Sequence, residues 1–310
     1  MEHSRRARLT KQLQWQLEKN KVVPILKIGE VASQSVCDGF AAKAIVVPAQ
    51  QLLSLATGKP NKRFQKIVAA GGLHPHLRYE HPIILSLVMK DELIAKCETA
   101  TLIELIRQTR PDFFTTPDGE TYDGEPETSR REINRMLTST DQLLAANLKA
   151  VPIGHIKGCN TMMIDEHQQA LAQRGIDLFF FHLTDFLRGH SKTMTNIGIG
   201  HVLHIKQKGV PLLVQGCGWR NHLRLNVADG IVTNSHLIAA IKGINFEVDR
   251  HHAGQERFSP SLVRRNYEVI VERFHQMKKQ KTLTEVFTQW EEAIETTEDQ
   301  PVQADLQART

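Results

Sequence analysis

The sequence predicts a (β/α)8 barrel with a C-terminal helical extension, and three observations support this fold class. Eight short apolar runs recur between residues 22 and 233, several of them continuous in apolar character, as in strands covered on both faces. Helical segments lie between the runs, and this alternation requires parallel strands. The eight units together have about the usual length of such a barrel. A doubly wound open sheet is the alternative.

The strands and the helices between them can be assigned in order. An amphipathic helix is expected over residues 10–20, before the first strand. Later helices are expected over residues 90–108, 128–147 and 165–174, where apolar side chains recur at near-helical spacing and Gly175 ends the last helix. The predicted strands are residues 22–28, 42–48, 82–89, 113–116, 150–156, 176–183, 211–215 and 226–233.

The chain divides into four segments. Residues 1–21 contain the N-terminal helix, and residues 22–243 form the barrel. Beyond Gly243 the composition becomes more polar, and residues 244–294 are predicted to form a loop and two polar helices. Residues 295–310 are expected to be a disordered tail.

Composition and charge limit the class of protein. The chain has 310 residues, of which 41% are hydrophobic and 24% charged, as in a soluble globular protein. The net charge of +5 permits a polyanionic partner without requiring one. Four widely spaced cysteines match no zinc or haem motif, so no metal or cofactor is predicted and a reducing compartment is expected. With no membrane-spanning run or signal sequence, we expect a cytoplasmic protein, or one in the host cytoplasm if phage-encoded.

Polar residues follow several of the predicted strands, and in a barrel the carboxyl ends of the strands meet around one pocket. Asp118 is the first of these, because the apolar run 113–116 ends in Pro117, Asp118 and Gly119, which do not easily continue a strand. Carboxylates, a lysine, and glycines that let the backbone come close to a ligand suit a small, planar, polar ligand. The other candidates are Ser86, Lys157, Gly158, His182, Asp185, Gly216, Gly218 and Asp229.

Asp229 lies in the apolar run 227–232. Burying an ionised carboxylate there is costly unless it is paired, which suggests a functional reason for its position. The alternative is that Asp229 begins the strand and faces solvent at the bottom of the barrel. For Lys157 and His182, the alternatives are a solvated loop lysine and a hydrogen-bonded core histidine.

The segment that begins at Gly71 reads GGLHPHLRYEHPIIL. It resembles the Gly-Gly-Leu-His segment and the following strand of the tRNA-guanine transglycosylase superfamily. Residues 111–118 resemble the family's strand that ends in the base-binding aspartate, and GHIKGC at 154–159 resembles its Gly-Ile-Val-Gln-Gly-Gly segment. QGCGWRNHL at 215–223 and ADGIV at 228–232 resemble its Gly-Val-Gly turn and its Phe-Asp-Cys-Val-Leu strand.

The resemblance implies a role for each matching residue. Asp229 would be the nucleophile that attacks the anomeric carbon, and Asp118 would hold the guanine-like base. Lys157 and Gly158 would replace the family's Gln-Gly pair at the heterocycle. The further residues expected around the base are His182, Leu183, Ser86 and Gly216.

Three departures from the family are visible. The family's general acid/base aspartate after the third strand is absent from residues 85–88, and the nearest aspartate that follows is Asp91. The Cys-x-Cys-x-x-Cys zinc site is missing, and so is the insertion before the fourth strand. These differences favour a divergent relative, similar to the DpdA-like enzymes that insert 7-deazaguanines into DNA.

The expected function is therefore exchange of a guanine in DNA for a 7-deazaguanine through a covalent aspartyl intermediate. The same exchange on tRNA or other RNA is one alternative, and a non-catalytic nucleic-acid-binding relative is another; an unrelated small-molecule barrel enzyme is a third. The expected partners are DNA and a 7-deazaguanine, with no membrane, and an oligomer or accessory protein is left open. Phosphate contacts are expected from Arg264, Arg265, Lys278 and Lys279, with Lys59, Lys62, Arg63 and Lys66 as further candidates.

Overall fold

Eight parallel strands form the centre of the molecule. The computed structural model describes residues 2–37, 41–121, 125–187, 192–216, 223–248 and 257–278. The strands lie in the order β1-β8-β7-β6-β5-β4-β3-β2, and a parallel bridge between Ile25 and Val46 joins the two ends of this order. The (β/α)8 barrel is thereby confirmed and the open sheet excluded. The strands are β1 (Val22–Pro24), β2 (Ile45–Pro48), β3 (Ile83–Ser86), β4 (Phe113–Thr115), β5 (Val151–Ile156), β6 (Phe179–His182), β7 (Leu212–Gln215) and β8 (Gly230–Thr233).

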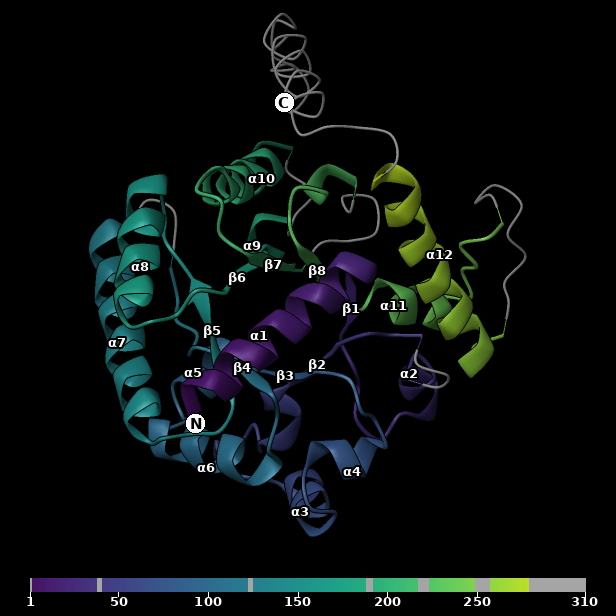
Figure 1. Cartoon of the computed structure of the whole chain (residues 1–310), viewed down its shortest axis with the longest axis horizontal. Helices are drawn as coiled ribbons and strands as arrows, with labels where there is room; N and C mark the ends of the chain where they lie inside the picture. Colours follow the sequence, from purple (N-terminus) through teal and green to yellow (C-terminus); the bar gives the residue numbers. More distant parts are fainter. Residues whose placement is uncertain are drawn as a thin grey trace, which may run out of the picture.

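Helices surround the barrel (Figure 1). The helix predicted over residues 90–108 is broken into two, because Glu98 takes an extended conformation between them. No helix in the described part of the chain is long and apolar enough to cross a membrane. The helices are α1 (Glu2–Lys19), α2 (Val31–Gln34), η2 (Ala49–Leu52), α3 (Lys62–Ala69), α4 (Leu73–Leu77), α5 (Asp91–Ile94), α6 (Thr99–Thr109), α7 (Pro126–Ala145), α8 (Thr161–Gln173), α9 (Thr184–Leu187), α10 (Lys192–Gln207), η5 (Leu223–Leu225), α11 (Ser235–Ile241) and α12 (Pro260–Lys278).

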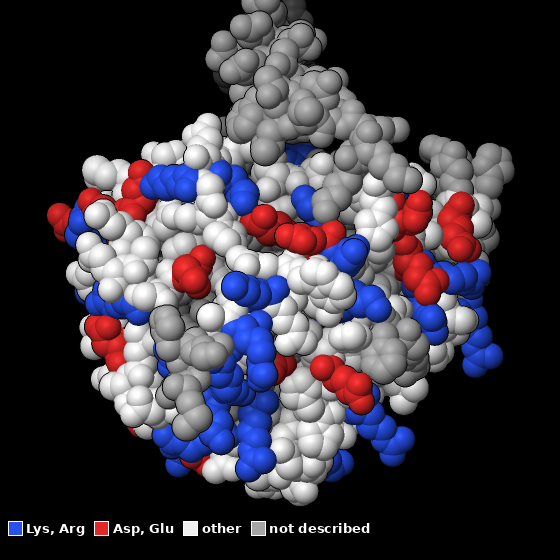
Figure 2. Space-filling view, in the orientation of Figure 1, with Lys and Arg blue, Asp and Glu red and all other residues white. Residues whose placement is uncertain are grey.

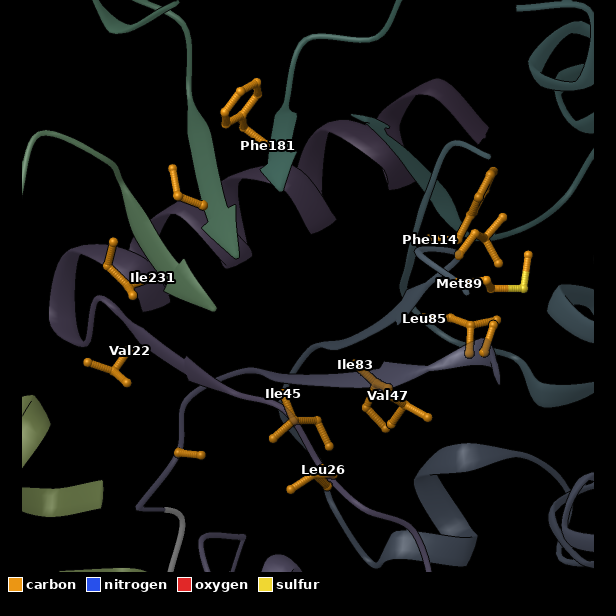
Figure 3. Close-up of a cluster of buried hydrophobic side chains, with 14 of the residues drawn as sticks. Val22, Leu26, Ile45, Val47, Ile83, Leu85, Met89, Phe114, Phe181 and Ile231 are labelled. Carbon is orange, nitrogen blue, oxygen red and sulfur yellow. The ribbon is translucent and has the colours of Figure 1, made fainter. Parts of the chain in front are cut away.

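The alternation of side chains along each strand divides the core into two parts. One set of side chains points outward to the helices, and Figure 3 shows Ile45, Val47 and Ile231 among this set. The other set fills the barrel interior and includes Val46, Phe113 and Val232. The inward positions become polar at the last residues of β3, β6 and β7, which are Ser86, His182 and Gln215. The chemistry of the barrel interior is therefore concentrated at its C-terminal end.

Helix α1 closes the opposite end of the barrel and is longer than the sequence predicted. Its buried side chains, Leu9, Leu13 and Leu17, belong to the same cluster as the barrel interior. Gly230 opens β8 beneath this helix, and a Cβ atom there would lie 2.8 Å from Leu17 Cδ2. The absence of a side chain at Gly230 lets the helix approach the strand closely.

Helix α12 packs against the barrel wall. It contacts α11 and α2, and Tyr267 on its buried face is fully enclosed. The Tyr267 hydroxyl donates to the Val22 carbonyl at 3.0 Å and accepts from Asn20 Nδ2 at 2.9 Å. The first predicted C-terminal helix is therefore present as α12, whereas the second helix, over 284–294, and the tail, over 295–310, lie outside the described residues.

The Gly-Gly-Leu-His segment lies at the N-terminal end of the barrel. His74 Nε2 lies 2.9 Å from Asp112 Oδ2, and the same oxygen accepts a hydrogen bond from Ile83 N. Asp112 immediately precedes β4, and Ile83 begins β3. This segment therefore joins the starts of two strands, which is a structural role.

Candidate active site at the barrel mouth

A cavity of about 790 Å³ opens at the C-terminal end of the barrel. Every strand or the loop that follows it contributes to its lining, as expected for the functional face of this fold. The polar lining residues are Lys27, Gln50, Gln51, Ser86, Lys90, Asp91, Glu92, Asp118, Glu120, Thr121, Lys157, His182, Thr184, Gln215 and Asn234.

Asp118 is held at this cavity by the end of β4. At the end of β4, two threonine hydroxyls accept the hydrogen bonds that backbone carbonyls would accept in a continuing strand. Thr115 Oγ1 accepts from Leu87 N at 2.7 Å, and Thr116 Oγ1 accepts from His155 N at 2.7 Å. The chain then turns, and the Asp118 carboxylate accepts a hydrogen bond from Gly119 N at 2.8 Å. The Asp118 side chain is only 5% exposed, so its charge needs a partner.

Lys157 is that partner. Its Nζ atom lies 3.3 Å from Asp118 Oδ1, although Lys157 comes from the end of β5. Burial is the largest single effect on the pKa of Asp118 and raises it, but the Lys157 ammonium, the two nearby histidines and the hydrogen bond from Gly119 N together outweigh burial and hold the pKa below its usual value. The site therefore contains an ionised carboxylate beside a lysine ammonium, and the protein shields both side chains from most of the solvent.

His155 lies within the barrel next to this pair. Its Nδ1 atom is 3.7 Å from Asp118 Oδ1, and its ring packs edge-on against Phe180. Burial lowers the pKa of His155 to about 3, despite the opposing effect of the Asp118 charge. The His155 side chain is therefore an uncharged imidazole that lies beside the Asp118 carboxylate. Sequence reasoning missed it because it lies inside an apolar strand.

Further polar side chains face the cavity from β6, β7 and β8. His182 Nε2 lies 2.8 Å from Thr184 Oγ1. Gln215 lines the cavity, and its buried Oε1 atom has no hydrogen-bond partner among the residues that the structure describes. Asn234 follows β8 and also lines the cavity. Sequence reasoning did not single out Gln215, Asn234 or Thr184, because polar residues at strand ends are common and only the register shows which of them face inward.

The candidate residues from the sequence divide into two groups. Asp118, Lys157, His182 and Ser86 line one cavity, as expected. Gly158, Leu183 and Gly216 do not belong to its described lining. The Leu183 side chain is in the outer core, and its N–H donates to Gln215 O, so neither is directed at a ligand. A Cβ at Gly158 would lie 2.7 Å from Ile164 N, which assigns this glycine to close packing of α8.

The expectation that Asp229 shares the pocket with Asp118 is wrong. Strand β8 begins at Gly230, so Asp229 lies at the N-terminal end of the barrel. Its carboxylate accepts from Leu212 N, at the start of β7, and lies 2.7 Å from Lys206 Nζ on α10. Because Asp229 alternates with the inward-facing Gly230, its side chain points outward. This is the solvent-facing alternative that the sequence left open.

Of the four cations expected to bind phosphate, the structure describes the side chains of Arg264 and Arg265. Arg264 Nε lies 2.9 Å from Glu268 Oε1, and Arg265 Nη1 lies 3.7 Å from Glu247 Oε2, so both charges have acidic partners. Their role stays a prediction. Gly218, Lys279 and the side chains of Asp185 and Lys278 lie outside the described residues.

Comparisons with known proteins do not identify a family. No family model and no curated protein matches the chain. Solved structures share its fold at low identity. A phosphonopyruvate hydrolase in complex with oxalate and magnesium has a TM-score of 0.48 at 12% identity, covering 76% of this chain and 83% of its own. An aldolase, QR15, has a TM-score of 0.47 at 11% identity, covering 71% of this chain and 91% of its own.

A third structure, phosphoribosyl anthranilate isomerase from Thermococcus kodakaraensis, has a TM-score of 0.43 at 12% identity. It covers 81% of this chain and 98% of its own. Among the residues that the structure describes, no cluster of histidine, cysteine and carboxylate side chains could hold a metal ion. The class defined by fold and site is a (β/α)8 barrel with an acidic and basic residue pair in its mouth.

Proposed function

We propose that the mouth of this barrel binds a guanine-like base and that the protein exchanges such a base in DNA for a 7-deazaguanine. The observation that carries the proposal is the pairing of Asp118 and Lys157 within one cavity, with 3.3 Å between Nζ and Oδ1. A carboxylate accepts the two neighbouring N–H groups at N1 and N2 of guanine, while an ammonium donates to O6. Both guanine and 7-deazaguanine present this edge.

The Oε1 atom of Gln215, which has no partner within the described part of the chain, adds to this argument. A buried acceptor without a hydrogen bond is costly, and a ligand N–H group in the cavity would satisfy it. Asn234 and the His182–Thr184 pair offer both donors and acceptors to the remaining edges of a heterocycle. The cavity therefore suits a flat ligand with donors and acceptors on several edges.

The exchange is balanced without any oxidant or reductant. The bond between C1′ of the nucleotide and N9 of guanine breaks, and the equivalent nitrogen of the incoming base forms a new bond to C1′. The proton that this nitrogen loses ends on the departing guanine. Negative charge near C1′ stabilises the oxocarbenium-like transition state.

Asp229 is too remote to supply that charge, so we assign the role to a carboxylate of the cavity itself. Asp91 and Glu92, in the first turn of α5, and Glu120, in the loop after β4, line the same cavity as Asp118. Their positions leave Asp118 free to hold the base. The variants Asp91→Asn, Glu92→Gln and Glu120→Gln show which carboxylate has this role. The variant that lacks it is expected to lose base exchange while it still binds guanine.

The test measures two quantities on the same protein. Calorimetry measures binding of guanine and 7-deazaguanine, and radiolabelled guanine measures exchange into DNA and into RNA. Asp118→Asn is expected to abolish both, whereas Asp229→Asn, at the other end of the barrel, is expected to retain both. Failure of the wild-type protein to bind either base would overturn the proposal. Binding without exchange would favour a non-catalytic protein, and exchange into RNA alone would correct the substrate.

A further inference from the structure

Helix α1 presents a basic surface on the side of the molecule opposite the cavity. Its apolar side chains, Leu9, Leu13 and Leu17, are buried against the N-terminal end of the barrel. The opposite side of the helix is exposed and carries Arg8, Lys11 and Lys19 at helical spacing. Trp15 lies on the same exposed side and is 53% exposed, which is unusual for a tryptophan.

The charges of this surface are largely uncompensated. In the part of the chain that the structure describes, neither Arg8 nor Lys11 takes part in a hydrogen bond or ion pair, unlike Arg264 and Arg265 on α12. Lys19 Nζ lies 5.7 Å from the centre of the Trp15 ring. Uncompensated cations beside an exposed aromatic ring form a surface that attracts anions.

Further cations extend this surface beyond the helix. Arg5 of α1 donates to the Lys149 carbonyl, and Arg107 of α6 lies 3.5 Å from the Ala146 carbonyl, so both reach the loop between α7 and β5. Figure 2, in the same orientation as Figure 1, shows lysine and arginine side chains gathered in a band at and below α1. We define the α1 basic surface as Arg5, Arg8, Lys11, Trp15, Lys19, Arg107 and Lys149.

We propose that the α1 basic surface binds the phosphate backbone of a nucleic-acid strand. The spread of cations over two helices and a loop fits a chain of phosphates, and Trp15 is exposed enough to stack on an unpaired base. An anionic membrane is the less suitable partner, because a membrane-binding helix inserts its apolar face, and the apolar face of α1 is already packed on the barrel.

The position of the surface separates it from the reaction. The cavity opens at the C-terminal end of the barrel, and α1 covers the N-terminal end. A base held at Asp118 and the phosphates held at α1 therefore belong to different stretches of nucleic acid. The surface would keep the protein on a polymer while the mouth acts on another part of it, and its binding does not depend on the proposed base exchange.

The test is fluorescence anisotropy with a labelled single-stranded oligonucleotide on the full chain at low salt. The double variant Arg8→Glu/Lys11→Glu is expected to bind the oligonucleotide about tenfold more weakly or worse. The slope of its affinity against salt concentration should correspond to about one to two fewer released counterions. Trp15→Ala is expected to weaken binding to single strands by about tenfold while leaving the salt dependence unchanged. Both variants alter only exposed side chains, and circular dichroism verifies that they fold.

The matched control is Arg131→Glu/Lys242→Glu, which makes the same change in charge at two exposed cations on α7 and at the end of α11, outside the α1 basic surface. It is expected to lose less than about threefold in affinity. Equal losses in both double variants would show that net charge alone drives binding, and would overturn the proposal. Unchanged binding by Arg8→Glu/Lys11→Glu, or binding of phosphatidylserine vesicles without binding of the oligonucleotide, would also overturn it.

Discussion

The Nζ atom of Lys157 lies 3.3 Å from Oδ1 of Asp118, and the two residues come from the ends of neighbouring strands. Because Asp118 is almost completely buried, removal of the lysine leaves a charge without a partner. We expect Lys157→Met to reduce the free energy of unfolding by about 3–5 kcal/mol at neutral pH, measured by urea denaturation. The double variant Asp118→Asn/Lys157→Met is expected to recover part of this loss, since it contains no unpaired charge.

The pH dependence of this pair follows from the direction of its pKa shift. The pKa of Asp118 is lower in the folded protein than in the unfolded chain, so the stability it contributes is present above the unfolded pKa, about 3.9. It is lost as the pH falls through the lower, folded pKa. The deficit of Lys157→Met relative to wild type should therefore be largest at neutral pH and shrink in acid. A deficit independent of pH would contradict the ion pair.

Asp229 provides the contrasting prediction. Its carboxylate is 41% exposed and joins Lys206 to the start of β7 from outside the barrel. Asp229→Asn retains an oxygen that can accept from Leu212 N, so we expect a loss of about 1 kcal/mol or less in the free energy of unfolding. Binding of guanine in the mouth should not change. Loss of binding in a folded Asp229→Asn protein would show that the carboxylate acts on the site despite its distance.

Asp118 and Asp229 show how far the sequence could predict the site. Asp118 was predictable because an apolar run ends abruptly in Pro117, Asp118 and Gly119, and such an end fixes the place of the residue in a barrel. Asp229 lies in an apolar run that has no such boundary. Only the pairing of β8 with β7 and β1 shows that the strand starts at Gly230 and that Asp229 faces outward.

The eight strands were predictable because each contains a short apolar run, and several of these runs are apolar on both faces. The polar residues that complete the mouth were not. Gln215 and Asn234 resemble many polar residues at strand ends, and their inward direction depends on a register that the sequence does not contain. His155 is hidden for the opposite reason, because a histidine in the middle of a buried strand is ordinary until Asp118 is found beside it.

The His74–Asp112 contact predicts a second dependence of stability on pH. The hydrogen bond to Asp112 raises the pKa of His74, despite the opposing effect of burial. A folded pKa above the unfolded value means that this stability is fully present below the unfolded pKa, about 6.5, and is lost as the pH rises through the folded pKa. We expect His74→Gln to cost about 1–2 kcal/mol at pH near 5.5 and less at pH near 8.5. Equal costs at both values would exclude a charged histidine.

Gly216 gives the last prediction, because it reaches the mouth indirectly. It has a φ of 99°, and a Cβ atom there would lie 2.4 Å from Thr184 Oγ1, the atom paired with His182. We expect Gly216→Ala to cost about 1–3 kcal/mol and to weaken guanine binding by displacing Thr184 and His182 together. Gly200→Ala in α10 is the matched control: a Cβ there has no atom within 4 Å, and alanine favours the helix by about 0.5–1 kcal/mol. If Gly216→Ala loses stability but binds guanine as wild type does, Thr184 and His182 do not contact the base. The proposed polar contacts to the base would then come from Asp118, Lys157, Gln215 and Asn234.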